Sequence, residues 1–384
     1  MSQSARRNAK VPGSEMTAML IIFVSTNAFL TYPRYISLNG YEAAWMEPVF
    51  SGVLTLILFF LVEQLLRRYF KNLDIVEVSK EVFGRFGAIL IALVFSLYFL
   101  CSTAAVMREF TENVVSTVLP STPILIVGAV FMFAVGYIVY GGIEGICRTA
   151  FIFLPILLVG LVAVCLMTVN WWHPYMLLPL WGTGPEQVLR GSLQYSSIFA
   201  NVLLLTIIYP HVHDTSKMRR IGFVSIVVST LLLVGLMLTY HMVFPAAETG
   251  KTSFALYRLA RMIHLGPFFQ RLESIFIFLW VTAATVRMAV TLWGCSYLLG
   301  KAFGWPTYRP AVPALVLLSF SLGMWPENWI QVINFDGTYL LRWGWIVVFA
   351  IPIAVLSIGA MVRSMRGGGR LHGGQRGRRR MQRV

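Results

Sequence analysis

The chain has 384 residues, of which 57% are hydrophobic and only 12% are charged, and its formal net charge is +15. No soluble core of this length needs so much apolar surface, so composition excludes a soluble fold. Continuous apolar runs of about 20 residues indicate α-helical membrane spans, whereas the strands of a membrane β-barrel alternate apolar and polar positions. The composition therefore predicts an all-α polytopic membrane protein.

Hydropathy windows of about 19 residues predict ten membrane helices. They cover residues 15–36, 45–66, 87–108, 123–141, 147–168, 191–210, 219–243, 270–299, 311–325 and 339–362. Ten helices divide into five and five, so we predict one transmembrane domain over residues 1–362 with inverted repeats of about 15–168 and 191–362. A basic tail rich in glycine and arginine follows over residues 363–384.

Basic residues set the expected orientation, because cytoplasmic connections carry an excess of lysine and arginine. Most of the 31 basic residues fall before the first helix, in alternate connections, or in the tail. The long 244–270 connection carries Lys251, Arg258 and Arg261 on the other side, and its stretch over 253–264 is a predicted interfacial helix. Both termini are therefore expected in the cytoplasm, with the tail at the anionic lipid surface rather than on nucleic acid.

Polar side chains interrupt the first and sixth predicted helices near their centres. They are Ser25, Thr26 and Asn27 in the first helix, and Ser196, Ser197 and Asn201 in the sixth. Interruptions at corresponding positions of two halves point to a central ligand site between broken helices. The alternative is that these side chains bond to their own helix or to neighbouring helices.

Arg287 lies near the middle of the eighth predicted helix. A buried arginine is costly in hydrocarbon and normally faces a cavity or a partner, so we place it in the ligand site. A purely structural ion pair is the alternative, with Glu109, Glu112 or Glu273 as the candidate partner. Three more residues complete the predicted ligand-binding set: Tyr98 and Ser102, which share one helix face, and Thr285.

Other chemistries find little support in the sequence. The four cysteines are scattered without C-x-x-C spacing, so we expect neither disulfides nor a metal site. His211, His213 and Asp214 have no second cluster to complete a metal site, and a solvated loop is the simpler interpretation. No nucleophile constellation, P-loop or dinucleotide turn is recognisable, so we predict neither an enzyme nor a cofactor.

Several short motifs, weak singly but ordered along nearly the whole chain, carry a family resemblance. They are Pro33 with Asn39 to Trp45, Met107 to Phe110 with Leu119 to Pro123, Glu144 to Arg148, Pro210 with Asp214, and Arg271 to Glu273 with Trp280. On these motifs the chain resembles the B-subunit family of spore germinant receptors, the endospore germination permeases of the amino acid–polyamine–organocation superfamily. The resemblance implies a LeuT-like inverted repeat of ten helices and a small-molecule germinant site near mid-membrane. It also implies assembly with A and C subunits in the spore inner membrane.

Two functions from different classes fit these observations. One is a receptor subunit that binds a nutrient such as an amino acid and signals to its partners. The other is a secondary transporter of an amino acid or amine coupled to protons or sodium. A proton-coupled carrier is expected to hold an intramembrane carboxylate. The carboxylates Glu15, Glu63, Glu109 and Glu273 fall at predicted span ends, which favours the receptor.

Overall fold

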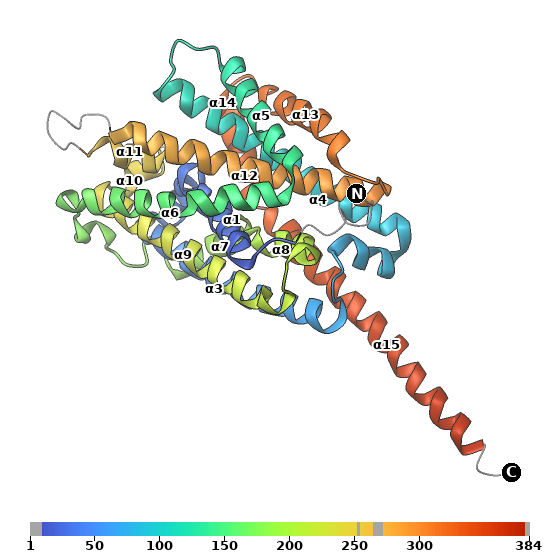
Figure 1. Cartoon of the computed structure of the whole chain (residues 1–384). Helices are drawn as coiled ribbons and strands as arrows, with labels where there is room; N and C mark the ends of the chain where they lie inside the picture. Colours follow the sequence, from blue (N-terminus) through green and yellow to red (C-terminus); the bar gives the residue numbers. More distant parts are fainter. Residues whose placement is uncertain (1–9, 252–253, 264–271, 381–384) are drawn as a thin grey trace.

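The computed structural model describes residues 10–251, 254–263 and 272–380, and these form a nearly all-helical bundle (Figure 1). The first half contains α1 (Gly13–Ser25), α2 (Tyr32–Gly40), α3 (Glu47–Tyr69), α4 (Ile75–Thr117), α5 (Ile124–Gly141) and α6 (Ile143–Met167). The second half contains α7 (Pro185–Gln194), α8 (Asn201–Ile208), α9 (Met218–Val243), α10 (Ala246–Thr249), α11 (Ala255–Arg261), α12 (Leu272–Phe303), α13 (Val312–Met324), α14 (Trp329–Phe335) and α15 (Ile351–Arg380). The predicted interfacial helix corresponds to α11, and both its predicted ends lie outside the described residues.

Each of the ten predicted ranges overlaps a helix of the structure. Among the described residues, seven helices are long and apolar enough to cross a membrane, or up to eight if the bent pair that includes α7 and α8 is one span. The first and ninth predicted helices are short here, because α1 and α13 have 13 residues each. The structure therefore confirms an all-helical, multi-pass membrane protein, and the count of ten remains a prediction.

Two helices extend further than predicted. Asp74 caps α4 by accepting from the Glu77 N–H at 2.9 Å, and α4 then runs to Thr117 with an interruption at Gly84, where φ is +71°. The last apolar span begins at Trp329 rather than at residue 339 and continues through π-helical turns into α15. Hydropathy windows end where charged residues occur, so they place helix ends too early when such residues are buried inside the protein.

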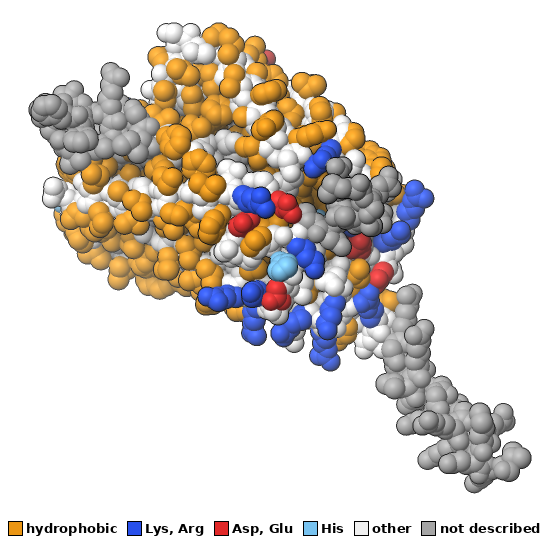
Figure 2. Space-filling view, viewed as in Figure 1, with side chains coloured by type: hydrophobic (Ala, Val, Ile, Leu, Met, Phe, Trp, Pro, Cys, Tyr) orange, Lys and Arg blue, Asp and Glu red, His pale blue; other side chains and the backbone are white. Residues whose placement is uncertain are grey.

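The two sets of connections lie at opposite ends of the bundle. At one end Val11 pairs with Val212, and Lys301 after α12 contacts Asp74 before α4. At the other end the rings of Phe254 and Trp329 stack at 5.1 Å. Figure 2 shows charged side chains gathered at the end from which α15 extends, beside a broad hydrophobic surface. This grouping agrees with the basic connections sharing one side.

α1 lies in the interior of the bundle, against α6, α9 and α12 (Figure 1). Every residue from Ala18 to Pro33 is buried. By contrast, Ile152 and Val159 of α6 are more than 60% exposed, as expected for a lipid-facing surface. A helix that is buried all round can place polar groups at mid-depth only against protein partners, so the central polar residues of this helix must face other helices.

Candidate functional site

The first helix is interrupted at the predicted polar residues. α1 ends at Ser25, a short 3₁₀ turn covers Thr26–Phe29, and α2 begins at Tyr32 after one extended residue. Thr26 Oγ1 lies 2.6 Å from the Ile22 carbonyl and 3.2 Å from the Ala283 carbonyl of α12. Asn27 Nδ2 donates to the Val24 carbonyl at 2.8 Å. Asn27 thus bonds to its own helix, as the alternative interpretation held, whereas Thr26 also contacts α12.

The sixth predicted helix is interrupted as well. α7 ends at Gln194, a 3₁₀ turn covers Ser196–Phe199, and the two parts bend by 41°. Ser196 donates to its own Leu193 carbonyl at 2.7 Å, but Ser197 donates to Leu341 of the last span at 2.6 Å. Of these two adjacent serines, Ser197 connects the interruption to another helix, whereas Ser196 bonds within its own segment.

Arg287 lies at the end of α1. Its Nη1 donates to the Phe23 carbonyl at 3.1 Å, and its guanidinium stands 5.0 Å from the centre of the Phe23 ring. The C-terminal turn of a helix carries partial negative charge, which favours a cation there. Among the described residues the Arg287 Nε has no hydrogen-bond partner although it is buried. One donor of the guanidinium is therefore available to a ligand.

Three side chains interact electrostatically with Arg287: Asp336, Tyr98 and Glu109. Of the partners predicted for this arginine, Glu109 is thus close by, and Asp336 was not foreseen. Glu112 instead contacts Arg108 at 3.3 Å, one turn away on α4. The side chain of Glu273 lies outside the described part of the chain.

Tyr98 and Ser197 meet beside Gly344 of the last span. A Cβ on Gly344 would lie 2.9 Å from the Ser197 Cβ and 3.1 Å from the Tyr98 hydroxyl, which is too close for both. The glycine therefore permits the close approach of three segments that are far apart in sequence. Together with Thr26 and Arg287, these side chains form what we call the central cluster (Thr26, Tyr98, Ser197 and Arg287).

The other predicted residues lie elsewhere or bond locally. Asn201 faces α9, where its Nδ2 is 3.5 Å from the Ser225 hydroxyl. Thr285 donates to Val281 of its own helix at 2.8 Å. Ser25 is fully buried at the end of α1, and Ser102 is buried one turn after Tyr98. None of these four residues has a hydrogen bond to the central cluster among the contacts of the described residues.

Sequence reasoning named Glu109 only as a candidate partner of Arg287, and it missed the group that Glu109 forms with Asp336 and the hydroxyl of Thr31. Thr31 Oγ1 is 3.1 Å from Glu109 Oε1 and 3.2 Å from Asp336 Oδ2. Glu109 was expected at a span end, and that expectation is wrong because α4 continues for two more turns and buries it. Asp336 stands three residues before the predicted tenth helix, so its position beside an apolar run was the available signal.

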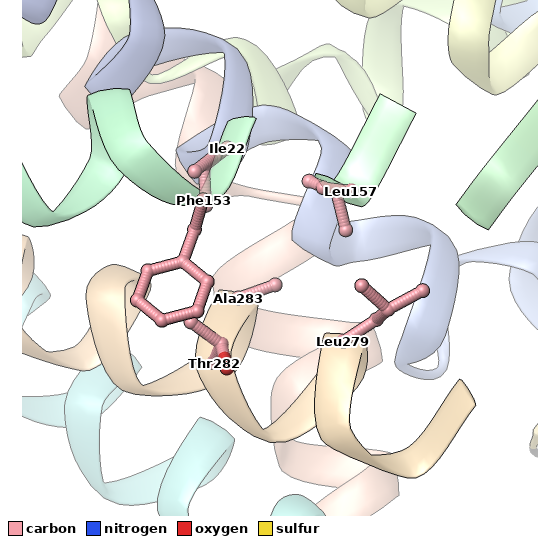
Figure 3. A pocket seen from close by; sticks show the side chains of 6 residues that line it. All are labelled: Ile22, Phe153, Leu157, Leu279, Thr282 and Ala283. Carbon is pink, nitrogen blue, oxygen red and sulfur yellow. The ribbon is translucent and has the colours of Figure 1, made fainter. Parts of the chain in front are cut away.

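A small pocket opens between α1, α6 and α12 (Figure 3). Its volume is about 10 Å³, roughly that of one water molecule. Apolar side chains dominate its lining, with Thr282 the polar exception: Ile22, Phe153, Leu157, Leu279, Thr282 and Ala283. It contains none of the predicted ligand residues, so the central cluster is the better candidate for a polar ligand.

Solved structures share this architecture. A crystal structure of MhsT in complex with L-phenylalanine matches with a TM-score of 0.61 at 17% identity, covering 87% of each chain. The structure of Mhp1, a nucleobase-cation-symport-1 family transporter, in a closed conformation with bromovinylhydantoin bound matches with a TM-score of 0.60 at 11% identity, covering 92% of this chain and 90% of that one. At these identities the likeness shows the fold, a transporter fold of the LeuT type.

Curated relatives are spore germination proteins. Spore germination protein KB of Bacillus subtilis (strain 168) is 25% identical, covering 74% of this chain and 76% of that protein. Spore germination protein GerQB of Bacillus cereus is 21% identical over 84% of this chain and 88% of that protein. A family model described as spore germination protein matches residues 10–332. The chain therefore belongs to the spore germination protein family of membrane permeases.

Proposed function

We propose that this protein is the germinant-sensing membrane subunit of a spore germinant receptor. It binds a small nutrient, such as an amino acid, near mid-membrane and signals to partner subunits to start germination. Family membership supports this function, and the transporter fold supports a small-molecule ligand. In this proposal the ten helices form two inverted repeats, with the first and sixth broken. Both termini are cytoplasmic, and A and C subunits are its partners in the spore inner membrane.

The observation that carries the proposal is Arg287, a buried arginine beside the interruption of the first helix. Its free Nε and its fixed position at the Phe23 carbonyl suit a ligand carboxylate, which a guanidinium binds through paired hydrogen bonds. Tyr98 and Ser197 add hydroxyl groups on the facing helices. A small molecule with a carboxylate, as in an amino acid, is the class of ligand that this chemistry favours.

Binding would signal through the helices that meet at the site. A ligand carboxylate competes with the Phe23 carbonyl for Arg287, so it weakens one link between α1 and α12. The same ligand gains contacts from Tyr98 and Ser197, which belong to α4 and the α7–α8 connection. A ligand shifts a conformational equilibrium only by its difference in affinity for the two states. These exchanged contacts supply that difference.

The test is a thermal-shift screen of the purified full chain against amino acids, sugars and nucleosides. We expect one class to raise the melting temperature, with the shift lost in Ser197→Leu, Asn27→Leu and Arg287→Leu variants that still accumulate in the membrane. Ser197→Ala, which removes only the hydroxyl, should lose the shift as well, and Ser192→Ala is its matched control, because the Ser192 hydroxyl bonds to its own helix. An unchanged response in the Arg287 variant would overturn the assigned site.

A secondary transporter of an amino acid or amine, coupled to protons or sodium, is the second candidate. The buried carboxyls of Glu109 and Asp336 favour it, because intramembrane carboxyls commonly serve ion-coupled transport. Uptake of the radiolabelled stabilising ligand into proteoliposomes separates the two functions. Concentrative uptake driven by a proton or sodium gradient would support the transporter. Binding without uptake, together with co-purification of A and C subunits, would support the receptor.

A further inference from the structure

Thr31 joins two carboxyl groups that come from distant parts of the chain. Its hydroxyl lies within hydrogen-bonding distance of Glu109 on α4 and of Asp336 at the start of the last span's π-helical turn. Thr31 is fully buried and Glu109 is 1% exposed, whereas Asp336 is partly exposed. The group therefore has a buried side at Glu109 and a partly exposed side at Asp336.

The single hydrogen of the Thr31 hydroxyl cannot serve two ionised carboxylates at once. A threonine hydroxyl has one hydrogen to donate, and an ionised carboxylate can only accept. Both oxygen–oxygen contacts, at 3.1 and 3.2 Å, are satisfied together when one carboxyl carries a proton and donates to the hydroxyl. Glu109 Oε2 is also buried without a hydrogen-bond partner among the described residues. An ionised carboxylate there would lose its solvation uncompensated, whereas a carboxylic acid loses much less.

The charges around the pair lead to the same conclusion. Arg287 interacts electrostatically with both carboxyls, and Tyr98 and Tyr35 interact electrostatically with Asp336. Arg34 of α2 acts on Tyr35. Neighbouring Arg108 and Glu112 contact each other on α4. Two carboxylates against one arginine leave a net negative charge at membrane depth, which is costly, and one bound proton removes it.

We propose that Glu109 and Asp336 form a proton-binding site that holds a single proton between them, with the Thr31 hydroxyl as the connecting group. Deprotonation leaves two negative charges facing Arg287 and draws the guanidinium away from the Phe23 carbonyl at the end of α1. Proton occupancy and the position of α1 are therefore linked. The proton site itself does not depend on which ligand, if any, the central cluster binds.

Infrared spectroscopy of the purified full chain in lipid nanodiscs tests this site directly. Near neutral pH we expect a carboxylic acid C=O band that is lost in both Glu109→Gln and Asp336→Asn, because either substitution leaves one carboxyl balanced by Arg287. Thr31→Val should keep the band and shift its frequency, since the acid loses its hydrogen-bond partner. Glu112→Gln, one turn along α4 and partly exposed, is the matched control and should leave the band unchanged.

Three results would overturn the proposal. One is a wild-type spectrum that is the same as those of the Glu109 and Asp336 variants at neutral pH. Another is a band that survives in one of these variants, which would assign the proton to a single residue. The third is stabilisation by sodium at constant pH that both variants abolish, which would make the site a sodium site. Melting curves of the variants establish that each is folded, so a lost band reports protonation.

Discussion

Gly344 shows how one residue without a side chain sets the geometry of the central cluster. It lies where Tyr98 of α4 and Ser197 of the α7–α8 connection converge on the last span. Helix interfaces in membranes often use small residues, because close backbone approach replaces the hydrophobic driving force available in water. Ser197 uses this approach to reach the Leu341 carbonyl at 2.6 Å. The two polar side chains can therefore share one ligand only while this position remains glycine.

Gly344→Ala should lower stability and ligand response together. The added methyl would meet the Ser197 Cβ at 2.9 Å, so one of the packed segments must move, at a cost of about 1–3 kcal/mol. Thermal melting with and without the stabilising ligand measures both effects. Gly235→Ala in α9 is the matched control, because its added Cβ would have nothing within 4 Å. Equal behaviour of the two variants would show that Tyr98 and Ser197 tolerate separation.

At the scale of the helix, polar residues in α1 have two distinct uses. The Asn27 side-chain amide donates to the Val24 carbonyl of α1, so it stabilises the end of that helix. Thr26 bonds within the helix and also approaches the Ala283 carbonyl of α12, and Arg287 of α12 donates back to Phe23. Two polar links therefore hold α1 against α12 over one turn. A ligand at Arg287 must act on this junction.

Thr26→Val should destabilise the protein more than Thr285→Val. Valine has the shape of threonine without the hydroxyl, and interhelical hydrogen bonds in membranes are worth about 0.6–2 kcal/mol. Thr285 donates within its own helix, so its loss should cost less than about 0.5 kcal/mol. Melting temperatures of the two variants in the same detergent compare them. A larger loss in Thr285→Val would place the important contact on the other face of α12.

The sequence predicted the positions of the helices better than their ends and partners. Apolar runs and the central polar residues located α1, α12 and the α7–α8 interruption, because these are local signals. Glu109 and Asp336 were placed outside the membrane helices, because each lies beside the edge of an apolar run, where a carboxyl lowers the mean hydropathy of the window. The two carboxyls meet through Thr31, which is 78 residues from Glu109 and 305 residues from Asp336 in sequence. Such pairings are tertiary, and no single window contains them.

Across the whole molecule, most basic connections share one end, where the start of α4 meets the end of α12. Asp74 is fully buried there and accepts from the Tyr297 hydroxyl at 2.9 Å and from Lys301 Nζ at 3.0 Å. Lys301 also contacts Glu77 at 2.7 Å. These contacts tie the first turn of α4 to the last turn of α12. Because α12 also carries Arg287, this one helix connects the charged end to the central cluster.

Lys301→Met should loosen the charged end and make the central residues more accessible. The substitution leaves the buried Asp74 carboxylate with the Tyr297 hydroxyl and the Glu77 N–H as its partners, and we expect a loss of about 1–2 kcal/mol after allowing for the partial exposure of the lysine. Lys217→Met is the control at the same end, because Lys217 and Asp214 form an exposed pair at 3.9 Å that contributes little to stability. Hydrogen exchange in nanodiscs should then rise along the last turns of α12 in the first variant alone.

Exchange that rises equally in both variants would mean that general surface charge, rather than the Asp74 contact, holds this end closed. A selective rise, accompanied by altered ligand affinity, would show that closure at the charged end and binding beside α1 belong to one equilibrium.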